Sequence, residues 1–314
     1  MARSPSSPVA IPGTTASAAP GRPVVLNLLT SLRPGQWTKN LLVFAGLVFG
    51  QRLFDRTAVA DAAGAFAIFC GLSGAVYLVN DIADRESDRR HPLKALRPIA
   101  SGALPVPVAA LAATVLAAAA LAGAVALGRG FTIVAVVYLV LQGLYSAVFK
   151  HVVIMDVLTL AIGFVLRAAA GALAVQVEIS HWLFVCTILL ALFMALAKRR
   201  HEIVLLASGA TDHRPILGEY SPYLLDQMIS VVTASTLIAY IFYTVSPETQ
   251  EKFQTGWLGL TIPFPLYGIF RYLYLVHRRE GGGSPADMLL TDRPLLVCVA
   301  LWVLAVVEII YRPL

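Results

Sequence analysis

Charged residues are scarce in this chain of 314 residues. Asp, Glu, Lys and Arg make up only 13% of it, against 58% hydrophobic residues. Soluble globular domains carry about a quarter charged residues, so the composition excludes an ordinary soluble domain. Cysteine is scarce too: Cys70, Cys186 and Cys298 lie far apart in apolar stretches, which indicates neither a disulfide framework nor a cysteine metal site. The mean hydropathy of +0.76 instead indicates an all-α protein that crosses a membrane several times.

The first 23 residues differ from the rest in composition. Residues 1–23 are rich in proline, serine and alanine and contain no apolar core of signal-peptide length. We expect them to form a disordered cytoplasmic tail. The remaining residues, 24–314, would form one membrane domain.

Nine apolar stretches follow the tail, each close to the ~20 residues that an α-helix needs to cross the hydrocarbon layer. They cover residues 38–54, 58–79, 106–127, 131–149, 152–175, 181–197, 223–245, 257–276 and 294–311. The sequence therefore predicts a bundle of nine transmembrane helices.

The basic residues between these stretches are distributed unequally. With the N-terminus inside, 18 of the 24 Lys and Arg residues fall on the cytoplasmic side, five fall on the other side, and Arg167 lies within a span. Cytoplasmic loops of membrane proteins carry an excess of positive charge. The N-terminus and the most polar loops are therefore predicted to face the cytoplasm, from a bacterial plasma membrane.

The most polar loop, residues 80–102, follows the second span and holds nine charged residues in 23 positions. Its four acids lie between Asp81 and Asp88, and all of its bases except Arg85 follow them. If the helix continues through the loop, Asn80, Asp84 and Asp88 recur every fourth residue and share one face, with Asp81 beside them. Carboxylates so arranged repel one another unless a cation lies among them.

Oxygen ligands of this kind suit Mg²⁺, which usually binds one or two carboxylates together with substrate phosphates. We therefore predict that the amide and the three carboxylates hold Mg²⁺, and that the three aspartates act in catalysis on a diphosphate. Lys94 and Arg97, which follow the acids, would bind further phosphate. The alternative is a charged loop at the membrane surface, but such a loop has no need of acids in helical register.

Polar residues also lie near the ends of other spans. Lys39 opens the first span in GQWTKN, and Tyr145, Lys150 and Asp156 surround the link between spans four and five. Arg167 follows Asp156 by eleven residues, about three helical turns, so both side chains point the same way. A buried arginine faces a polar cavity or a partner. We predict substrate-binding roles for these residues. The alternatives are structural pairing of Asp156 and Arg167 with other groups and, for Lys39, a charge that only sets topology.

The sixth span ends in KRRHE, which contains Lys198, Arg199 and Glu202. Three adjacent bases are often a stop signal for membrane insertion. Glu202 lies four residues after Lys198, a spacing that fits a salt bridge or a contribution to the metal site. We include all three residues among the candidates for substrate binding.

Together these motifs resemble the UbiA superfamily of intramembrane prenyltransferases. The resemblance rests on N-D-x-x-D-x-x-x-D after the second of nine helices and covers roughly residues 30–311. The segments GQWTKN, HPLKALRPIASG, YSAVFK and AKRRHE, with Asp156 and Arg167, are most similar to its decaprenyl-phosphate phosphoribosyltransferases. The resemblance implies a helical bundle whose cavity opens to the cytoplasm and the bilayer and binds a diphosphate through Mg²⁺.

The same resemblance implies a reaction. A 5-phosphoribosyl group would pass from 5-phosphoribosyl 1-diphosphate to a polyprenyl (decaprenyl-type) phosphate in cell-envelope synthesis, for example of arabinan. The prenyltransferases carry a second aspartate-rich motif after span six; the KRRHE segment at that place in this chain has three bases and one acid, Glu202. The phosphates would be neutralised by Lys94, Arg97, Lys150, Lys198 and Arg199.

Two other functions stay open at this point. The first is a UbiA-type prenyltransferase that moves a polyprenyl group from its diphosphate to an aromatic or other small acceptor. The second is a transporter or channel, although the polar residues gather on one side rather than from face to face. No nucleic-acid partner is expected, and the sequence leaves a homo-oligomer open.

Overall fold

The computed structural model describes residues 22–91, 94–178, 180–207, 215–278, 288 and 291–312. In these ranges the chain forms α-helices and 3₁₀-helices and no strand, so the predicted all-α class is confirmed. The predicted tail, residues 1–23, lies almost wholly outside them.

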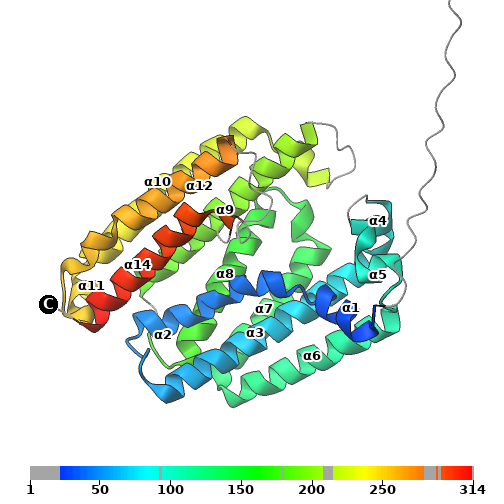
Figure 1. The fold of residues 1–314 in the computed structure, drawn as a ribbon, viewed down its shortest axis with the longest axis horizontal. Helices are drawn as coiled ribbons and strands as arrows, with labels where there is room; N and C mark the ends of the chain where they lie inside the picture. The colour runs from blue at the N-terminus through cyan, green and yellow to red at the C-terminus, as the bar shows by residue number, and fades with distance from the viewer. Residues whose placement is uncertain are drawn as a thin grey trace, which may run out of the picture.

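Among the described residues, seven helices are long and apolar enough to cross a membrane, and they pack side by side in one bundle (Figure 1). They are α3 (Arg56–Ala83), α6 (Val106–Ala126), α7 (Arg129–Ala147), α8 (Met155–Ala174), α9 (His181–Ala207), α10 (Pro222–Val245) and α14 (Arg293–Tyr311). α8 contacts α3, α7 and α9 and is the most buried of the seven. Polar side chains on α8 therefore face protein rather than lipid.

The count of nine transmembrane helices is not confirmed, because two predicted spans are not long α-helices. The stretch 38–54 forms a 3₁₀-helix, η1 (Pro34–Phe44), and the short α2 (Ala45–Phe49); the stretch 257–276 forms η5 (Trp257–Thr261) and α12 (Pro263–Arg278). A 3₁₀-helix rises about 2.0 Å per residue and an α-helix about 1.5 Å, so the two pairs are about 30 Å and 34 Å long. Each pair of elements is about as long as the hydrocarbon layer is thick, about 30 Å, although it contains fewer α-helical residues than a single transmembrane α-helix.

The η1–α2 segment packs directly on the backbone of α8. A Cβ atom on Gly171 would lie 1.9 Å from the Val43 carbonyl oxygen, and one on Gly46 would lie 2.7 Å from the Ala172 nitrogen. Neither position has room for a side chain. Gly46 and Gly171 therefore permit the close approach of the η1–α2 segment to α8.

Several helix ends meet at one end of the bundle, which we call the polar end (Figure 1). It comprises the C-terminal ends of α3, α7 and α9, the N-terminal ends of α8 and α10, and the short elements between them. Those elements are α4 (Arg85–Arg90), η2 (Lys94–Leu96), α5 (Pro98–Ser101), η3 (Phe149–His151) and η4 (Pro215–Glu219). α1 (Val24–Ser31) packs beside α3 and α5, and α11 (Pro247–Phe253) follows α10 at the opposite end.

We expect Gly171→Ala to destabilise the protein by about 1–3 kcal/mol, because the added methyl group forces η1 away from α8. Thermal unfolding in detergent would measure the loss. Gly64→Ala is the matched control, since a Cβ on Gly64 meets nothing within 4 Å and alanine favours a helix. Equal unfolding temperatures for the two variants would contradict the close contact.

Candidate active site

The acidic motif does not lie on one continuous helix, so the predicted stripe of four ligands is wrong as geometry. α3 ends at Ala83, and Asp84 has φ −87° and ψ 5° before α4 begins at Arg85. Backbone bonds from Asp84 to Asn80 and from Asp88 to Asp84 persist across this interruption, both at 2.8 Å. The side chains nevertheless point to two groups of partners, on opposite sides of the motif.

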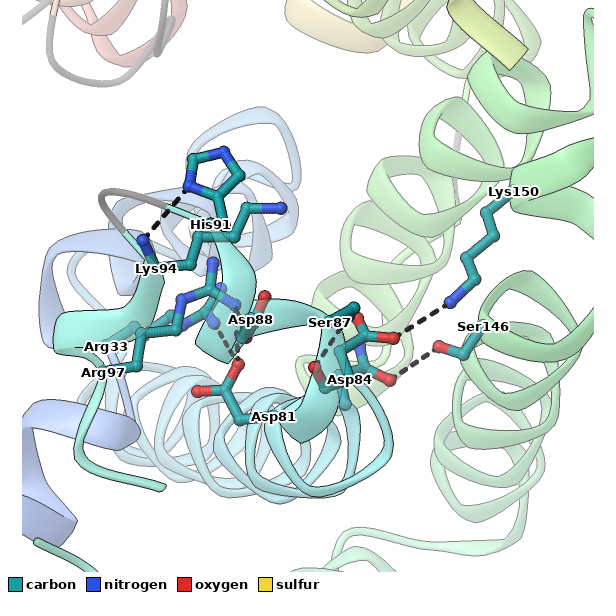
Figure 2. A network of polar contacts seen from close by, with 11 residues as sticks. Arg33, Asp81, Asp84, Ser87, Asp88, His91, Lys94, Arg97, Ser146 and Lys150 are labelled. Atoms are coloured by element: carbon teal, nitrogen blue, oxygen red, sulfur yellow. Dashed lines mark hydrogen bonds and ion pairs between the residues drawn. The ribbon is translucent and has the colours of Figure 1, made fainter. Parts of the chain in front are cut away.

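Asp81 and Asp88 form the buried side of the motif, and each is only 3% exposed. Arg97 donates to Asp88 at 2.6 Å and to Asp81 at 3.2 Å. Arg33 also donates to Asp81 and lies over the ring of Tyr77. Figure 2 shows both arginines beside these two carboxylates, whose charges are therefore already compensated.

Asn80 and Asp84 form the open side of the motif. The Ser146 hydroxyl donates to Asn80 Oδ1 at 2.7 Å, and Lys150 Nζ lies 3.4 Å from Asp84 Oδ1. The side chain of Asp84 is 43% exposed, in contrast to the buried pair. Figure 2 shows Asp84 pointing toward the end of α7, away from Arg97. Asp84 is thus the carboxylate of the motif that a ligand can reach.

A divalent cation fits the open side if the substrate supplies part of its coordination. Within the described ranges no three His, Cys, Asp or Glu side chains lie close enough to hold a metal ion by themselves. Asn80 and Asp84 offer one amide and one carboxylate oxygen donor, which is the small protein share typical of Mg²⁺ bound with phosphates. Metal ligation by Asp81 and Asp88 stays a prediction.

A second group of polar residues joins α8, α9 and the start of α10. Asp156 is fully buried and accepts hydrogen bonds from Arg199 Nε and from the Tyr220 hydroxyl, both at 2.7 Å. Arg199 also donates to Glu202 at 2.6 Å and to the Tyr145 hydroxyl at 3.5 Å. All three guanidinium nitrogens of Arg199 are therefore engaged within the protein.

The outer members of this group are more accessible. The side chain of Glu202 is half-buried, and Lys198 Nζ lies 3.8 Å from it. Two cations thus neutralise the one acid of the KRRHE segment, which leaves it poorly suited to hold a second metal ion. Lys198 is the more exposed of these cations and the one that can turn toward a ligand.

The C-terminal end of α7 links the two groups. Adjacent residues Tyr145 and Ser146 contact Arg199 of α9 and Asn80 of α3, and Lys150 of η3 reaches Asp84. Residues from the link between spans four and five therefore lie against both groups. The role of this link in substrate binding stays a prediction.

Arg167 does not pair with Asp156; each is paired structurally with other groups of the protein. The Arg167 guanidinium donates to Asn40 Oδ1 at 2.7 Å, the Gly163 carbonyl at 2.7 Å and the Tyr138 hydroxyl at 2.9 Å. Asn40 in turn donates to Ser73 at 3.2 Å. These bonds fasten η1 to α8 deep in the bundle, and no carboxylate is among the recorded partners of Arg167 in the described residues.

The two remaining predicted residues are lysines in short 3₁₀-helices. Lys39 lies in η1 next to Asn40, and Lys94 opens η2; both are half-buried. Sequence reasoning missed other residues that complete the network, namely Arg33, Asn40, Tyr138, Ser146 and Tyr220. Asn40 belongs to the GQWTKN motif and was within reach, whereas Tyr220 has no local signal.

We expect Arg199→Gln to destabilise the protein by about 3–5 kcal/mol, because it leaves the buried Asp156 carboxylate without its charged partner. Chemical unfolding in detergent would measure this. Arg312→Gln is the control, since Arg312 and its partner Glu308 are both well exposed and such pairs contribute little. Unchanged stability in Arg199→Gln would refute the buried ion pair.

Comparison with known proteins identifies the family. The model of the UbiA prenyltransferase family matches residues 40–291. The chain is 34% identical over 289 residues to decaprenyl-phosphate phosphoribosyltransferase of Corynebacterium glutamicum, covering 90% of this chain and 86% of that protein. It is 33% identical over 291 residues to the protein of the same name from Mycobacterium tuberculosis, covering 90% and 94%.

Solved structures show the same fold. A UbiA homolog from Archaeoglobus fulgidus bound to GPP and Mg²⁺ superposes with a TM-score of 0.68 at 22% identity, covering 90% of this chain and 99% of that one. The same homolog bound to DMAPP and Mg²⁺ gives 0.69 at 21% identity, with the same coverage. By sequence and by fold, this chain belongs to the UbiA prenyltransferase family.

Proposed function

We propose that this protein transfers a 5-phosphoribosyl group from 5-phosphoribosyl 1-diphosphate to a decaprenyl-type polyprenyl phosphate and releases diphosphate. The proposal rests on which acidic side chains at the polar end are accessible and which are already paired with cations. One open acid–amide pair, Asp84 and Asn80, faces Lys150, while Glu202 is already neutralised by two cations. The relatives named decaprenyl-phosphate phosphoribosyltransferase support the same reaction.

Asn80 and Asp84 would hold Mg²⁺ together with diphosphate oxygens. When bound, the ion would neutralise charge on the departing diphosphate. Lys150 lies close enough to Asp84 to contact the same diphosphate. Asp81 and Asp88 would then serve mainly to hold Arg33 and Arg97 at the edge of the site.

Lysines at the polar end would bind the other phosphates. Lys198 projects from α9 beside Glu202, Lys94 lies in η2, and Lys39 lies in η1. A donor with a 5-phosphate besides its diphosphate needs this additional positive charge. A polyprenyl diphosphate carries no such phosphate, so the surplus of bases favours phosphoribosyl transfer over prenyl transfer.

The chemistry needs no dedicated base. A polyprenyl phosphate is already anionic, so its oxygen can form the new bond to ribose C1 while the bond from C1 to the diphosphate oxygen breaks. Positive charge that develops on the ribose ring would be stabilised by fixed carboxylates and dipoles around it. The apolar helices would hold the lipid chain, and the site would face the cytoplasm.

We expect purified protein with Mg²⁺ to move label from phosphoribosyl diphosphate into polyprenyl phosphate. Asp84→Asn should lower the rate about 100-fold or more, the scale for losing a group that stabilises developing charge. A chelator should abolish transfer. Glu251→Gln, at the opposite end of the molecule, is the matched control and should keep full activity.

The runner-up function gives a different result in the same preparation. A UbiA-type prenyltransferase would transfer nothing from phosphoribosyl diphosphate and would instead join a polyprenyl diphosphate to an aromatic acceptor. That outcome would reject the proposed substrate and leave the family unchanged.

A further inference from the structure

Tyr220 lies between η4 and α10, and its hydroxyl contacts two segments at once. It accepts a hydrogen bond from the Ile154 backbone N–H at 2.7 Å and donates one to Asp156 Oδ1 at 2.7 Å. The residue is buried, and burial together with the Asp156 carboxylate raises the pKa of Tyr220 to about 12. The phenol therefore stays protonated and keeps donating to Asp156 at physiological pH.

Ile154, the residue that Tyr220 holds, has a strained backbone. Its φ of 68° and ψ of −40° are rarely adopted by a β-branched residue. Such a conformation persists only where the surroundings impose it. Its N–H bonds to Tyr220, and its carbonyl accepts from Leu158 at 2.9 Å, so the conformation is held from both sides.

The strained residue controls the link that carries Lys150. Lys150 lies in η3, four residues before Ile154, and η3 contacts both α8 and η4. Its ammonium group reaches Asp84 at 3.4 Å, at the open side of the acidic motif. The backbone conformation at Ile154 therefore determines the position of the Lys150 side chain relative to Asp84.

The other bond of Tyr220 leads to α9. Asp156 uses its second oxygen to accept from Arg199 Nε at 2.7 Å, and Arg199 holds Glu202 at 2.6 Å. The Tyr220 hydroxyl is therefore connected to two groups of residues. Through Ile154 it is connected to the segment that carries Lys150. Through Asp156 and Arg199 it is connected to Glu202, which lies beside Lys198.

We propose that Tyr220 is a positioning residue that sets Lys150 and the Arg199–Glu202 pair relative to each other through the single hydroxyl shared by Ile154 and Asp156. Tyr220 itself does not touch the substrate. The coupling stands on the contacts described above, and only its kinetic consequence rests on the proposed phosphoribosyl transfer.

The test compares Tyr220→Phe with Tyr223→Phe, a variant with the same chemical change at a residue that is 75% exposed. The first readout is amide hydrogen exchange over residues 148–156, where we expect about tenfold faster exchange in Tyr220→Phe because the Ile154 N–H loses its acceptor. The second is steady-state kinetics, where we expect kcat to fall about tenfold with KM for polyprenyl phosphate unchanged. Tyr223→Phe should match the wild type in both.

Exchange and kcat at wild-type values in Tyr220→Phe would overturn the proposal. Faster exchange with unchanged kcat would also overturn it, because the link would then move without consequence for transfer. If the wild type transfers no phosphoribosyl group, the proposed function fails, and the exchange readout alone decides the coupling.

Asp156→Asn provides a second variant should Tyr220→Phe not fold. Asparagine still accepts a hydrogen bond from Tyr220 but loses the charge that holds Arg199. We expect lower kcat with wild-type exchange over residues 148–156. Unchanged kcat in this variant would contradict the route through Arg199.

Discussion

An ionised side chain inside a bilayer needs a counter-charge or a full set of hydrogen bonds, and this requirement organises the polar end of the molecule. Asp156 is fully buried because Arg199 and Tyr220 satisfy it. Arg167, deeper in the bundle, is satisfied by neutral groups on three elements. Apart from the bond of Arg167 to Gly163 within α8, each of these contacts ties one element to another, so the contacts that compensate charge also pack the elements together.

The polar side chains that a ligand can reach are those that the buried ion pairs do not engage. Arg33 and Arg97 occupy two carboxylates of the acidic motif, which leaves Asp84 and Asn80 turned toward α7. Arg199 is enclosed, while Lys198 beside it remains accessible. The site therefore has a buried layer that fixes geometry and an outer layer that can meet phosphate, and adjacent residues in the sequence belong to different layers.

The sequence was sufficient to predict the helical class, seven of the apolar spans and the segments that meet at the polar end. Those conclusions depend on composition and on the direction of side chains within one helix. Pairings between helices could not be reached that way: helical register places Asp156 and Arg167 on one face, yet their partners come from α9 and η1. Likewise, an apolar run does not distinguish the 3₁₀-helix η1 from an α-helix, and nothing local marks Tyr220.

We propose that the open side of the motif holds a divalent cation only together with a diphosphate. Electron paramagnetic resonance of Mn²⁺, used in place of Mg²⁺, tests it on the purified protein. We expect weak Mn²⁺ binding by the protein alone, strong binding once phosphoribosyl diphosphate is added, and loss of that gain in Asp84→Asn. Strong binding without the diphosphate, or a gain that survives in Asp84→Asn, would contradict the proposal.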